Sequence, residues 1–239
     1  ARQLGVELAS LGISVDLAPV ADVNSNPANP AIGALERSFS PNPALVAAHA
    51  LAFGQGLAQS GIIPALKHFP GQGGAQKDSH LGLTDITRSW NAKADLAPYT
   101  QAFAQGWPGM VMLGHLFHTG LDAKYPATLS RTVVADLLRG RMGWQGVVIS
   151  DDMQMKAITA HYGMEQAVLL AERCRKAVQD SRHDHVGVVT LSIGLGELRP
   201  DEALADLIER VDQALYRAKK AGRNQTQVST AEEPPAVGI

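Results

Sequence analysis

The stretch GIIPALKHF, residues 61–69, is a short apolar run that ends in two polar side chains, Lys67 and His68. Runs of this length, rich in β-branched residues and bounded by glycine or proline, are typical of buried strands. Three other stretches share this design: ISVDLAPV (13–20), GMVMLGHL (109–116) and GVVISDDM (146–153). The sequence therefore predicts four strands, each with polar side chains at or just beyond its carboxyl end.

Helix-like stretches separate these strands. Residues 42–61 place alanine, leucine and phenylalanine at helical spacing and end at Gly61. Residues 130–143 begin at Ser130, which is a good N-cap, and end at Gly143. Alternation of strand and helix predicts a parallel β/α architecture. In (β/α) barrels, the polar residues at the carboxyl ends of the strands carry the chemistry.

The predicted strands are too few for a closed barrel. A closed (β/α) barrel has about eight strands, whereas this chain offers the four above and a different one at residues 187–196. An open parallel sheet leaves edges that another chain, the C-terminal segment or further sequence must cover. We expect an α/β fold, a partial (β/α) TIM-type barrel extended at its open edge by a strand–helix unit. The helix of that unit spans residues 202–224, with an apolar face made of Leu204, Leu207, Ile208, Val211, Leu215 and Ala218.

Composition and charge narrow the class of protein. Apolar residues make up 45% and charged residues 18% of the chain, which suits a soluble globular protein with a full core. The net charge of −2 offers no basic surface for nucleic acid, and no apolar stretch reaches the roughly 20 residues of a membrane helix. The single cysteine, Cys174, cannot form an internal disulfide, so cysteine usage does not identify the cellular compartment, and the cytoplasm is favoured. Because the chain begins at Ala1, we expect it to be a piece of a longer protein.

The loop KHFPGQGGAQKDSH, residues 67–80, admits three kinds of site. A structural zinc site needs four ligands, usually with cysteine among them, and no cysteine lies near His68 or His80. A phosphate cradle needs its lysine after the glycines, whereas Lys67 precedes them. A proton relay needs an imidazole tuned by a nearby carboxylate, which Asp78 and His80 can provide. The residues thus favour a proton relay over a metal or phosphate site, and no cofactor is expected.

Several motifs together resemble the family 3 glycoside hydrolases, in the β-N-acetylglucosaminidase branch. These motifs are KHFPGQG, then DSH, and then GVVISDDMQM. LAPVADVNSNPANPAIG with ERSF, and PATLSR with LLRGRMGWQG, fit the same family in the right order. The resemblance covers about residues 1–170. It implies a barrel domain that hydrolyses N-acetylglucosaminides, such as peptidoglycan fragments, without a cofactor.

The resemblance assigns roles to individual residues of this chain. Asp151, the first acid of SDDM, matches the nucleophile that forms a covalent glycosyl-enzyme on the retaining route. His80 matches the general acid/base of this branch, and Asp78 matches its partner in a dyad. Sugar-binding roles are implied for Arg37, Lys67 and His68.

Other positions are less specific. Asp22 and His115 lie at strand ends, where we expect supporting roles, and a hydrogen-bonded core histidine is the alternative for His115. Asp152 is expected to cap a helix. The family has a histidine where this chain has Gln72, which keeps hydrogen bonding but cannot carry a proton. The family's earlier strands, with an acidic and an arginine sugar ligand, are not matched in this chain.

The C-terminal part resembles a different family. GVVTLSIGLGE and DLIERVDQALYRAKKAGRNQ look like the late strand and last helix of a GGDEF domain, the diguanylate cyclase module. This resemblance covers about residues 171–228, and the Pro-rich tail, residues 229–239, is expected to be disordered. The signature loop of that module is absent from the sequence, so no cyclase site is assigned to any residue.

These resemblances predict a β-N-acetylglucosaminidase-like retaining glycoside hydrolase that is weak or inactive in this truncated form. The alternatives are a non-catalytic chimeric or recombinant scaffold and a degenerate cyclase-like signalling module. The expected partner is a carbohydrate substrate, with neither nucleic acid nor membrane. A homo-oligomer in which chains cover each other's open barrel edges is also expected.

Overall fold

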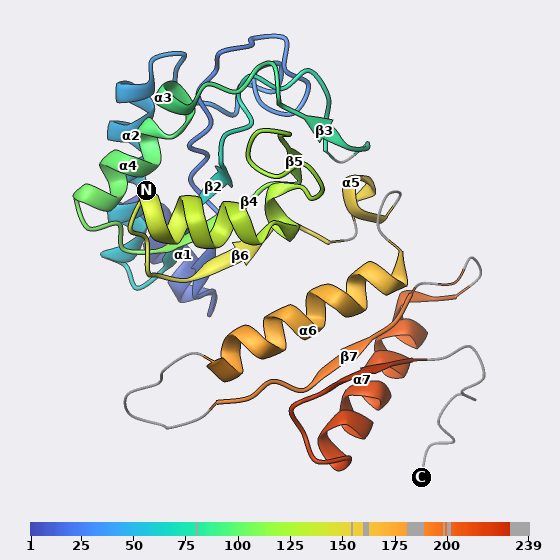
Figure 1. The fold of residues 1–239 in the computed structure, drawn as a ribbon. Helices are drawn as coiled ribbons and strands as arrows, with labels where there is room; N and C mark the ends of the chain where they lie inside the picture. Colours follow the sequence, from blue (N-terminus) through green and yellow to red (C-terminus); the bar gives the residue numbers. More distant parts are fainter. Residues whose placement is uncertain are drawn as a thin grey trace. The chain divides into compact units, whose positions relative to one another are not determined.

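The computed structural model describes residues 1–79, 81–153, 155–159, 163–180, 189–197, 199 and 202–229. The candidate acid/base His80 and most of the expected disordered tail, residues 230–239, lie outside the described residues. The chain forms two compact units, residues 1–161 and 162–239. Figure 1 shows the elements of both units, which are described separately below.

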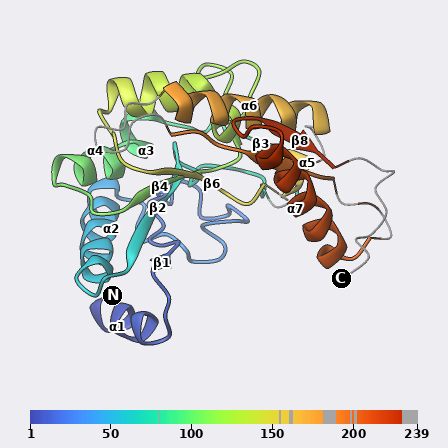
Figure 2. The same ribbon diagram turned by 90° about the horizontal axis from the view of Figure 1, so that it is seen from below.

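A parallel four-stranded sheet organises the first unit. Its strand order is β1-β2-β4-β6, so neighbours in the sheet follow one another along the chain, and Figure 2 shows the four strands side by side. All pairs are parallel, as the alternation of strand and helix predicted. The four predicted strands are confirmed at β1 (Val15–Asp16), β2 (Ile63–Phe69), β4 (Met110–Leu113) and β6 (Val148–Ser150).

The helices of this unit begin and end where their sequence signals predict. In α2 (Pro43–Ala58) the Asn42 side chain accepts a hydrogen bond from the Ala44 amide at 2.9 Å. Ser130 accepts one from the Val133 amide at 3.0 Å before the following helix, which has π-type hydrogen bonding. Gly143 ends that helix with a positive φ of 73°. This π-type helix is η2 (Thr132–Arg141). The other helices are α1 (Arg2–Ser10), α3 (Ala92–Asp95), α4 (Ala97–Ala104), η1 (Ala127–Leu129) and α5 (Lys156–Thr159).

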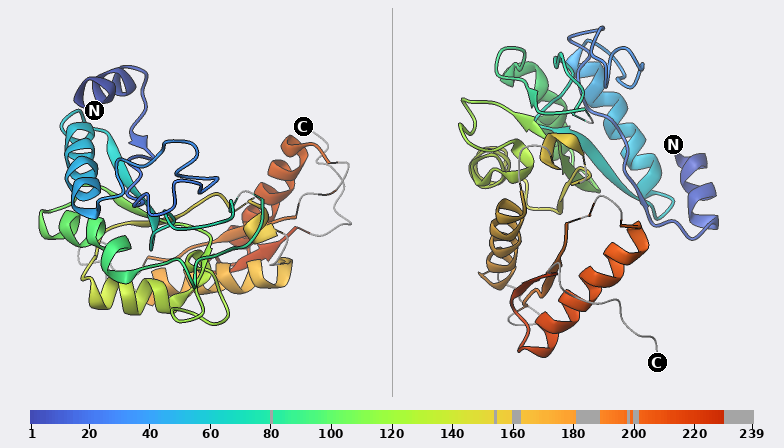
Figure 3. Two further views of the ribbon diagram at one scale, coloured as in Figure 1. Left: turned by 90° about the horizontal axis from the view of Figure 1, so that it is seen from above. Right: turned by 90° about the vertical axis from the view of Figure 1, so that its right-hand side faces the viewer.

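One core holds these helices against the strands. Phe69 of β2 and Tyr99 of α4 are fully buried, and their rings meet edge to face with centroids 5.0 Å apart. Leu138 brings η2 into the same core. Burying a side chain of this size contributes roughly 1.5–3 kcal/mol to stability. Helix α1 packs beside α2 instead (Figure 3), with Gly5 in close contact with Ser60.

Strand register brings the carboxyl ends of the strands to one edge of the sheet. Phe69 of β2 pairs with Leu113 of β4, and Leu113 pairs with Ser150 of β6. The residues that follow these three therefore share that edge. Two further short strands, β3 (Thr84–Asp85) and β5 (Leu116–Phe117), form a separate parallel pair. No helix within the described ranges is both long and apolar enough to cross a membrane.

The second unit is a strand–helix–strand arrangement with one further helix. β7 (Ile193–Leu195) and β8 (Thr226–Val228) pair in parallel, α7 (Leu204–Lys220) connects them, and α6 (Met164–Asp180) packs on both strands. β7 pairs with β8 in a sheet of its own. The expectation that this strand extends the barrel sheet is not confirmed: in the described residues its hydrogen-bonded partner is β8, which the sequence did not predict.

Helix α7 has the predicted amphipathic character with one correction. Ala214 and Ala218 are fully buried, and Gly194 of β7 approaches so closely that a Cβ there would lie 2.3 Å from the Val211 carbonyl. Ile208, however, is 60% exposed, so it does not belong to the buried face. The pattern therefore overestimated the width of that face.

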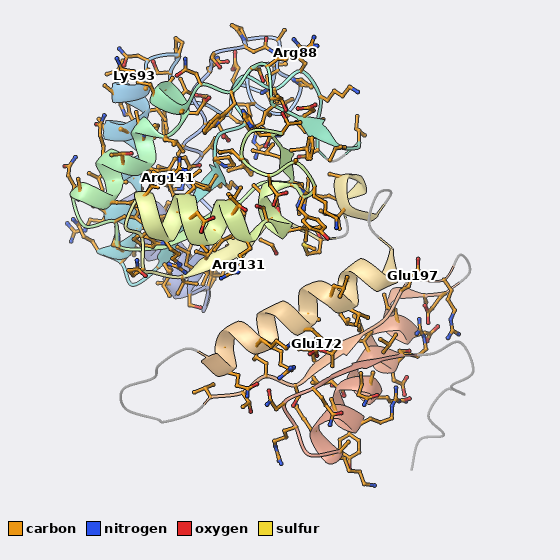
Figure 4. All side chains as sticks on the ribbon, in the orientation of Figure 1. Arg88, Lys93, Arg131, Arg141, Glu172 and Glu197 are labelled. Atoms are coloured by element: carbon orange, nitrogen blue, oxygen red, sulfur yellow. The ribbon has the colours of Figure 1, made fainter. Side chains whose placement is uncertain are left out.

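Ion pairs tie this unit together. The buried Arg210 donates to both carboxylate oxygens of Glu202, at 2.6 and 2.7 Å, and these bonds lower the pKa of Glu202 to about 2. Glu172 of α6, labelled in Figure 4, accepts from Arg175 and, at 2.7 Å, from Thr226 of β8. The bond between Glu172 and Thr226 connects α6 to β8, and Arg210 of α7 also donates to the Glu197 carbonyl, just beyond β7, at 3.0 Å.

Candidate functional site

A buried carboxylate–imidazole pair lies at the edge where the strands end. Asp22 is fully buried, and its Oδ2 is 2.7 Å from Nδ1 of His68. The main-chain amide of Gln72 donates to Oδ1 of Asp22 at 2.7 Å. Because a carboxylate only accepts, Nδ1 of His68 carries the hydrogen of this bond. The other ring nitrogen, Nε2, is left to face the rest of the site.

Asp151 lies on the far side of this imidazole. Its Oδ2 is 3.9 Å from Nε2 of His68, so Asp22, His68 and Asp151 form a line of carboxylate, imidazole and carboxylate. The Asp151 amide donates to the Leu113 carbonyl at 2.9 Å, which extends the β4–β6 pairing. Its Oδ1 accepts from the Asp152 amide, also at 2.9 Å. About 20% of the Asp151 side chain is exposed, so the carboxylate can meet a ligand.

Two cations lie close to this line. Lys67 is half-buried, and burial, together with the nearby positive charge of Arg37, lowers its pKa. The negative charges of Asp151, Asp16 and Asp22 oppose this shift. Arg37 is held by a hydrogen bond to the Ala31 carbonyl at 2.8 Å. The site therefore combines two cations with the Asp151 carboxylate, a set of groups that can bind sugar hydroxyls.

The glycine-rich loop is anchored next to its histidine. Gln72 is buried, and its side-chain amide donates to the Ser79 hydroxyl at 3.4 Å. The Ser79 carbonyl accepts from the Ala157 amide at 3.3 Å, just after the strand end that carries Asp151. Asp78 is half-buried and lines a surface pocket of about 610 Å³ with Leu81 and other residues of the loop. His80 follows Ser79 directly and is outside the described residues.

His115 is a buried histidine with both ring nitrogens bonded. Nδ1 lies 2.8 Å from the Thr128 hydroxyl, and Nε2 lies 2.8 Å from the main-chain carbonyl of Asp152. Burial lowers the pKa of His115. This environment fits the core-histidine alternative, but one of the two partners belongs to the turn that carries Asp151.

The structure therefore brings together five sequence-selected residues at the carboxyl ends of the strands. Asp78 lies in the adjoining loop. In the part of the chain that the structure describes, no group of three or more His, Cys, Asp or Glu side chains is arranged to hold a metal ion. Sequence reasoning missed Ser79 and Thr128, because the sequence gives no signal of the hydrogen-bond partner of a hydroxyl side chain. The five residues are Arg37, Lys67, His68 and Asp151, together with Asp22.

A second buried carboxyl group, Asp95, packs behind this site. Its Oδ2 accepts from the Asn91 amide at 2.7 Å, while Oδ1 has no hydrogen-bond partner in the described residues. Gly71 approaches it so closely that a Cβ there would lie 2.6 Å from Cβ of Asp95. Burial, with a smaller contribution from the negative charge of Asp22, raises the pKa of Asp95 to about 6. No sequence signal distinguishes this aspartate from a surface one.

We expect Asp95→Asn to stabilise the protein above about pH 6 and to change little near pH 4. The folded pKa of Asp95 lies above its unfolded value of 3.8, so the folded state loses stability as pH rises from about 4 through 6. Asparagine keeps the bond from Asn91 without the charge, and a gain of about 1–2 kcal/mol is expected at pH 7.5. Urea unfolding at both pH values measures it, with the exposed Asp136→Asn as control. An equal change at the two pH values would contradict the prediction.

Comparison with known families identifies two regions of the chain. The model described as "Glycosyl hydrolase family 3 N terminal domain" matches residues 1–181. The model described as "Diguanylate cyclase, GGDEF domain" matches residues 150–225, so the two matched regions overlap. The candidate site described above lies wholly within the first region.

Characterised relatives match the same N-terminal part. Beta-hexosaminidase LpqI of Mycobacterium bovis is 42% identical over 181 residues, which cover 71% of this chain and 44% of that protein. Beta-hexosaminidase A of Pseudoalteromonas piscicida is 38% identical over 182 residues, covering 71% of this chain and 30% of that protein. The chain thus spans less than half of the length of these relatives.

Solved structures give the same result. A family 3 β-N-acetylglucosaminidase from Paenibacillus sp. is 37% identical with a TM-score of 0.66, covering 72% of this chain and 33% of that one. A β-N-acetylhexosaminidase from Beutenbergia cavernae is 33% identical with a TM-score of 0.67, covering 73% of this chain and 53% of that one.

Proposed function

Because the chain belongs to glycosyl hydrolase family 3 through the N-terminal domain of that family, we propose that it acts as a β-N-acetylglucosaminidase-like retaining glycoside hydrolase. The observation that carries this proposal is the line of Asp22, His68 and Asp151 at the carboxyl ends of the strands, with Lys67 beside it. The proposed substrates are N-acetylglucosaminides such as peptidoglycan fragments. The names of the relatives, hexosaminidases and an N-acetylglucosaminidase, support this class.

In the proposed reaction, the Asp151 carboxylate attacks the anomeric carbon and the glycosidic bond breaks, which leaves a covalent glycosyl-enzyme. His80, paired with Asp78, donates a proton to the leaving oxygen. It then takes a proton from the water that hydrolyses the intermediate, so the configuration is retained. The cations of Arg37 and Lys67 and the His68 ring hold the sugar hydroxyls.

We expect slow turnover from this chain alone. The described sheet has four strands, about half of a closed barrel. It therefore does not supply the sugar ligands that further strands of a barrel would carry. Each missing charged hydrogen bond costs about 1.5–3 kcal/mol, and two such losses predict activity about two to four orders of magnitude below a full-length family member. Hydrolysis of an aryl N-acetyl-β-glucosaminide, measured for both proteins, tests this. Turnover within tenfold of the relative, lost on His80→Ala, would refute the expected weakness.

The open edges of the sheet support a proposal about assembly. β1 and β6 are the outer strands, and apolar side chains next to both are exposed. We expect a homo-oligomer in which chains cover these edges, since unpaired edges attract further pairing. Light scattering at micromolar concentration measures this, and a monodisperse monomer would count against it. The exposed side chains are Leu11, Ile13, Val15, Leu17 and Val147.

The domain division remains part of the proposal. We assign residues 1–170 to the glycosidase barrel, residues 171–228 to a GGDEF-like fragment and residues 229–239 to a tail. The match of residues 150–225 to the GGDEF model favours one alternative function, a degenerate cyclase-like module. That match supplies no residue with an assigned cyclase role. A chimeric scaffold without activity is the other alternative, and covalent labelling of Asp151 separates it from the hydrolase.

A further inference from the structure

His115 is bonded to the turn that carries the proposed nucleophile. It lies just beyond β4 and is completely buried. Its Nε2 is 2.8 Å from the main-chain carbonyl of Asp152. A carbonyl oxygen only accepts, so Nε2 donates to it whether the imidazole is neutral or charged. On the opposite side of the ring, Nδ1 is 2.8 Å from the Thr128 hydroxyl, which fixes the orientation of the imidazole.

Asp152 connects this imidazole to the carboxylate of Asp151. The amide of Asp152 donates to Oδ1 of Asp151 at 2.9 Å, while the carbonyl of Asp152 is the group that His115 holds. The Asp151 amide is fixed separately by the Leu113 carbonyl. Hydrogen bonds therefore hold the main chain on both sides of Asp152, and Oδ1 of Asp151 is bonded within this turn. Oδ2 is the oxygen that faces His68, 3.9 Å away.

We propose that His115 is a positioning residue for Asp151. By holding the Asp152 carbonyl, it orients the Asp152 amide, and that amide orients the carboxylate so that Oδ2 is presented to the sugar. The inference rests on the proposed function, because only a retaining glycosidase uses Asp151 as a nucleophile. Misplacing a reacting group by about 1 Å can slow a reaction about a hundredfold. A fixed position of the turn at Asp151 and Asp152 is therefore expected to speed the attack by Asp151.

Two substitutions of similar size separate the two bonds of His115. The amide nitrogen of glutamine reaches the position of Nε2, so His115→Gln keeps the bond to the Asp152 carbonyl. The amide nitrogen of asparagine reaches only the position of Nδ1, so His115→Asn keeps the bond to Thr128 and loses the one to Asp152. Both variants bury a neutral amide. Val133 lies on η2 and is buried in the hydrophobic core, so Val133→Ala creates a cavity there. This variant is the control for a general loss of stability.

The decisive measurement is amide hydrogen exchange at Asp151 and Asp152 by NMR, with β2 amides as the reference. Loss of one hydrogen bond is expected to speed local exchange about three- to tenfold in His115→Asn. His115→Gln should match the parent chain, and Val133→Ala should change the site and β2 together. Equal exchange in the Gln and Asn variants would overturn the proposal.

A kinetic readout distinguishes this proposal from the function on which it rests. The rate of covalent labelling of Asp151 by an activated N-acetylglucosaminide should fall about tenfold or more in His115→Asn and recover in His115→Gln. If the parent chain shows no labelling at all, the proposed function fails. The exchange comparison needs no substrate, and it then still decides whether His115 holds the turn.

Discussion

Asp151→Asn is expected to abolish formation of the glycosyl-enzyme, while Asp152→Asn leaves it nearly unchanged. An amide is a poor nucleophile, so the covalent step loses its attacking group. Asp151 has Oδ2 directed to His68, with part of the side chain exposed. Asp152 contributes main-chain groups to the turn, namely the amide that binds Asp151 and the carbonyl that binds His115. Asparagine at position 152 keeps both of these groups.

Intact mass spectrometry after incubation with an activated N-acetylglucosaminide measures the adduct directly, and it detects single turnovers even when steady-state hydrolysis is slow. We expect an adduct in the parent chain and in Asp152→Asn, and labelling at least about a thousandfold slower in Asp151→Asn. The two substitutions are isosteric and adjacent, so each serves as the control for the other. Reversed effects would show that Asp152 is the nucleophile.

Asp22→Ala is expected to be the most destabilising single substitution at the site, lowering the free energy of unfolding by about 2–5 kcal/mol. Asp22 is fully buried and accepts from Nδ1 of His68 and from the Gln72 amide, both at 2.7 Å. Alanine leaves both buried donors without a partner. Urea unfolding measures the loss, and Asp16→Asn on β1 is the control, because it removes a half-buried carboxylate nearby. A similar change for both variants would contradict a special role for Asp22.

Asp22→Asn tests the contribution of Asp22 to the reaction of Asp151 separately from its contribution to the stability of the fold. The asparagine oxygen can still accept from the Gln72 amide, but its amide group then faces Nδ1 of His68 as a donor. The imidazole must move its hydrogen to Nε2, which faces Asp151. This change of tautomer is expected to slow labelling of Asp151 about 10²- to 10⁴-fold. Nitrogen-15 shifts of the His68 ring report the tautomer, and unchanged shifts would rule out this explanation.

The sequence predicted correctly those features that depend on short, local patterns of residues. Apolar runs bounded by glycine gave all four strands of the first sheet, and their polar ends gave Lys67, His68 and Asp151. Parallel register then brings these ends to one edge without further information. The loop residues themselves favoured a relay of Asp78 and His80, while the roles of Arg37, Lys67, His68 and Asp151 came from family motifs. All of these roles remain predictions.

The rest of the site depends on contacts between distant segments. The bond between His68 and Asp22 joins β2 to the segment after β1, and the bond from His115 to the Asp152 carbonyl joins the segment after β4 to the segment after β6. No periodicity encodes such pairs. The same limit explains why the sequence did not predict the partner of β7, because β8 is a strand of three residues that follows a helix and carries no alternating pattern.

The pairing of β7 with β8 also has a consequence for how the chain folds. The two strands are separated along the sequence only by α7 and its connections, and α6 is the helix that comes before them in the chain. Contacts between residues close in sequence form quickly, because closing a short loop costs little chain entropy. This segment can therefore complete its own strand pairing without searching the preceding 161 residues for a partner. This locality limits the time for which the strand edges of β7 and β8 are exposed to neighbouring chains during synthesis.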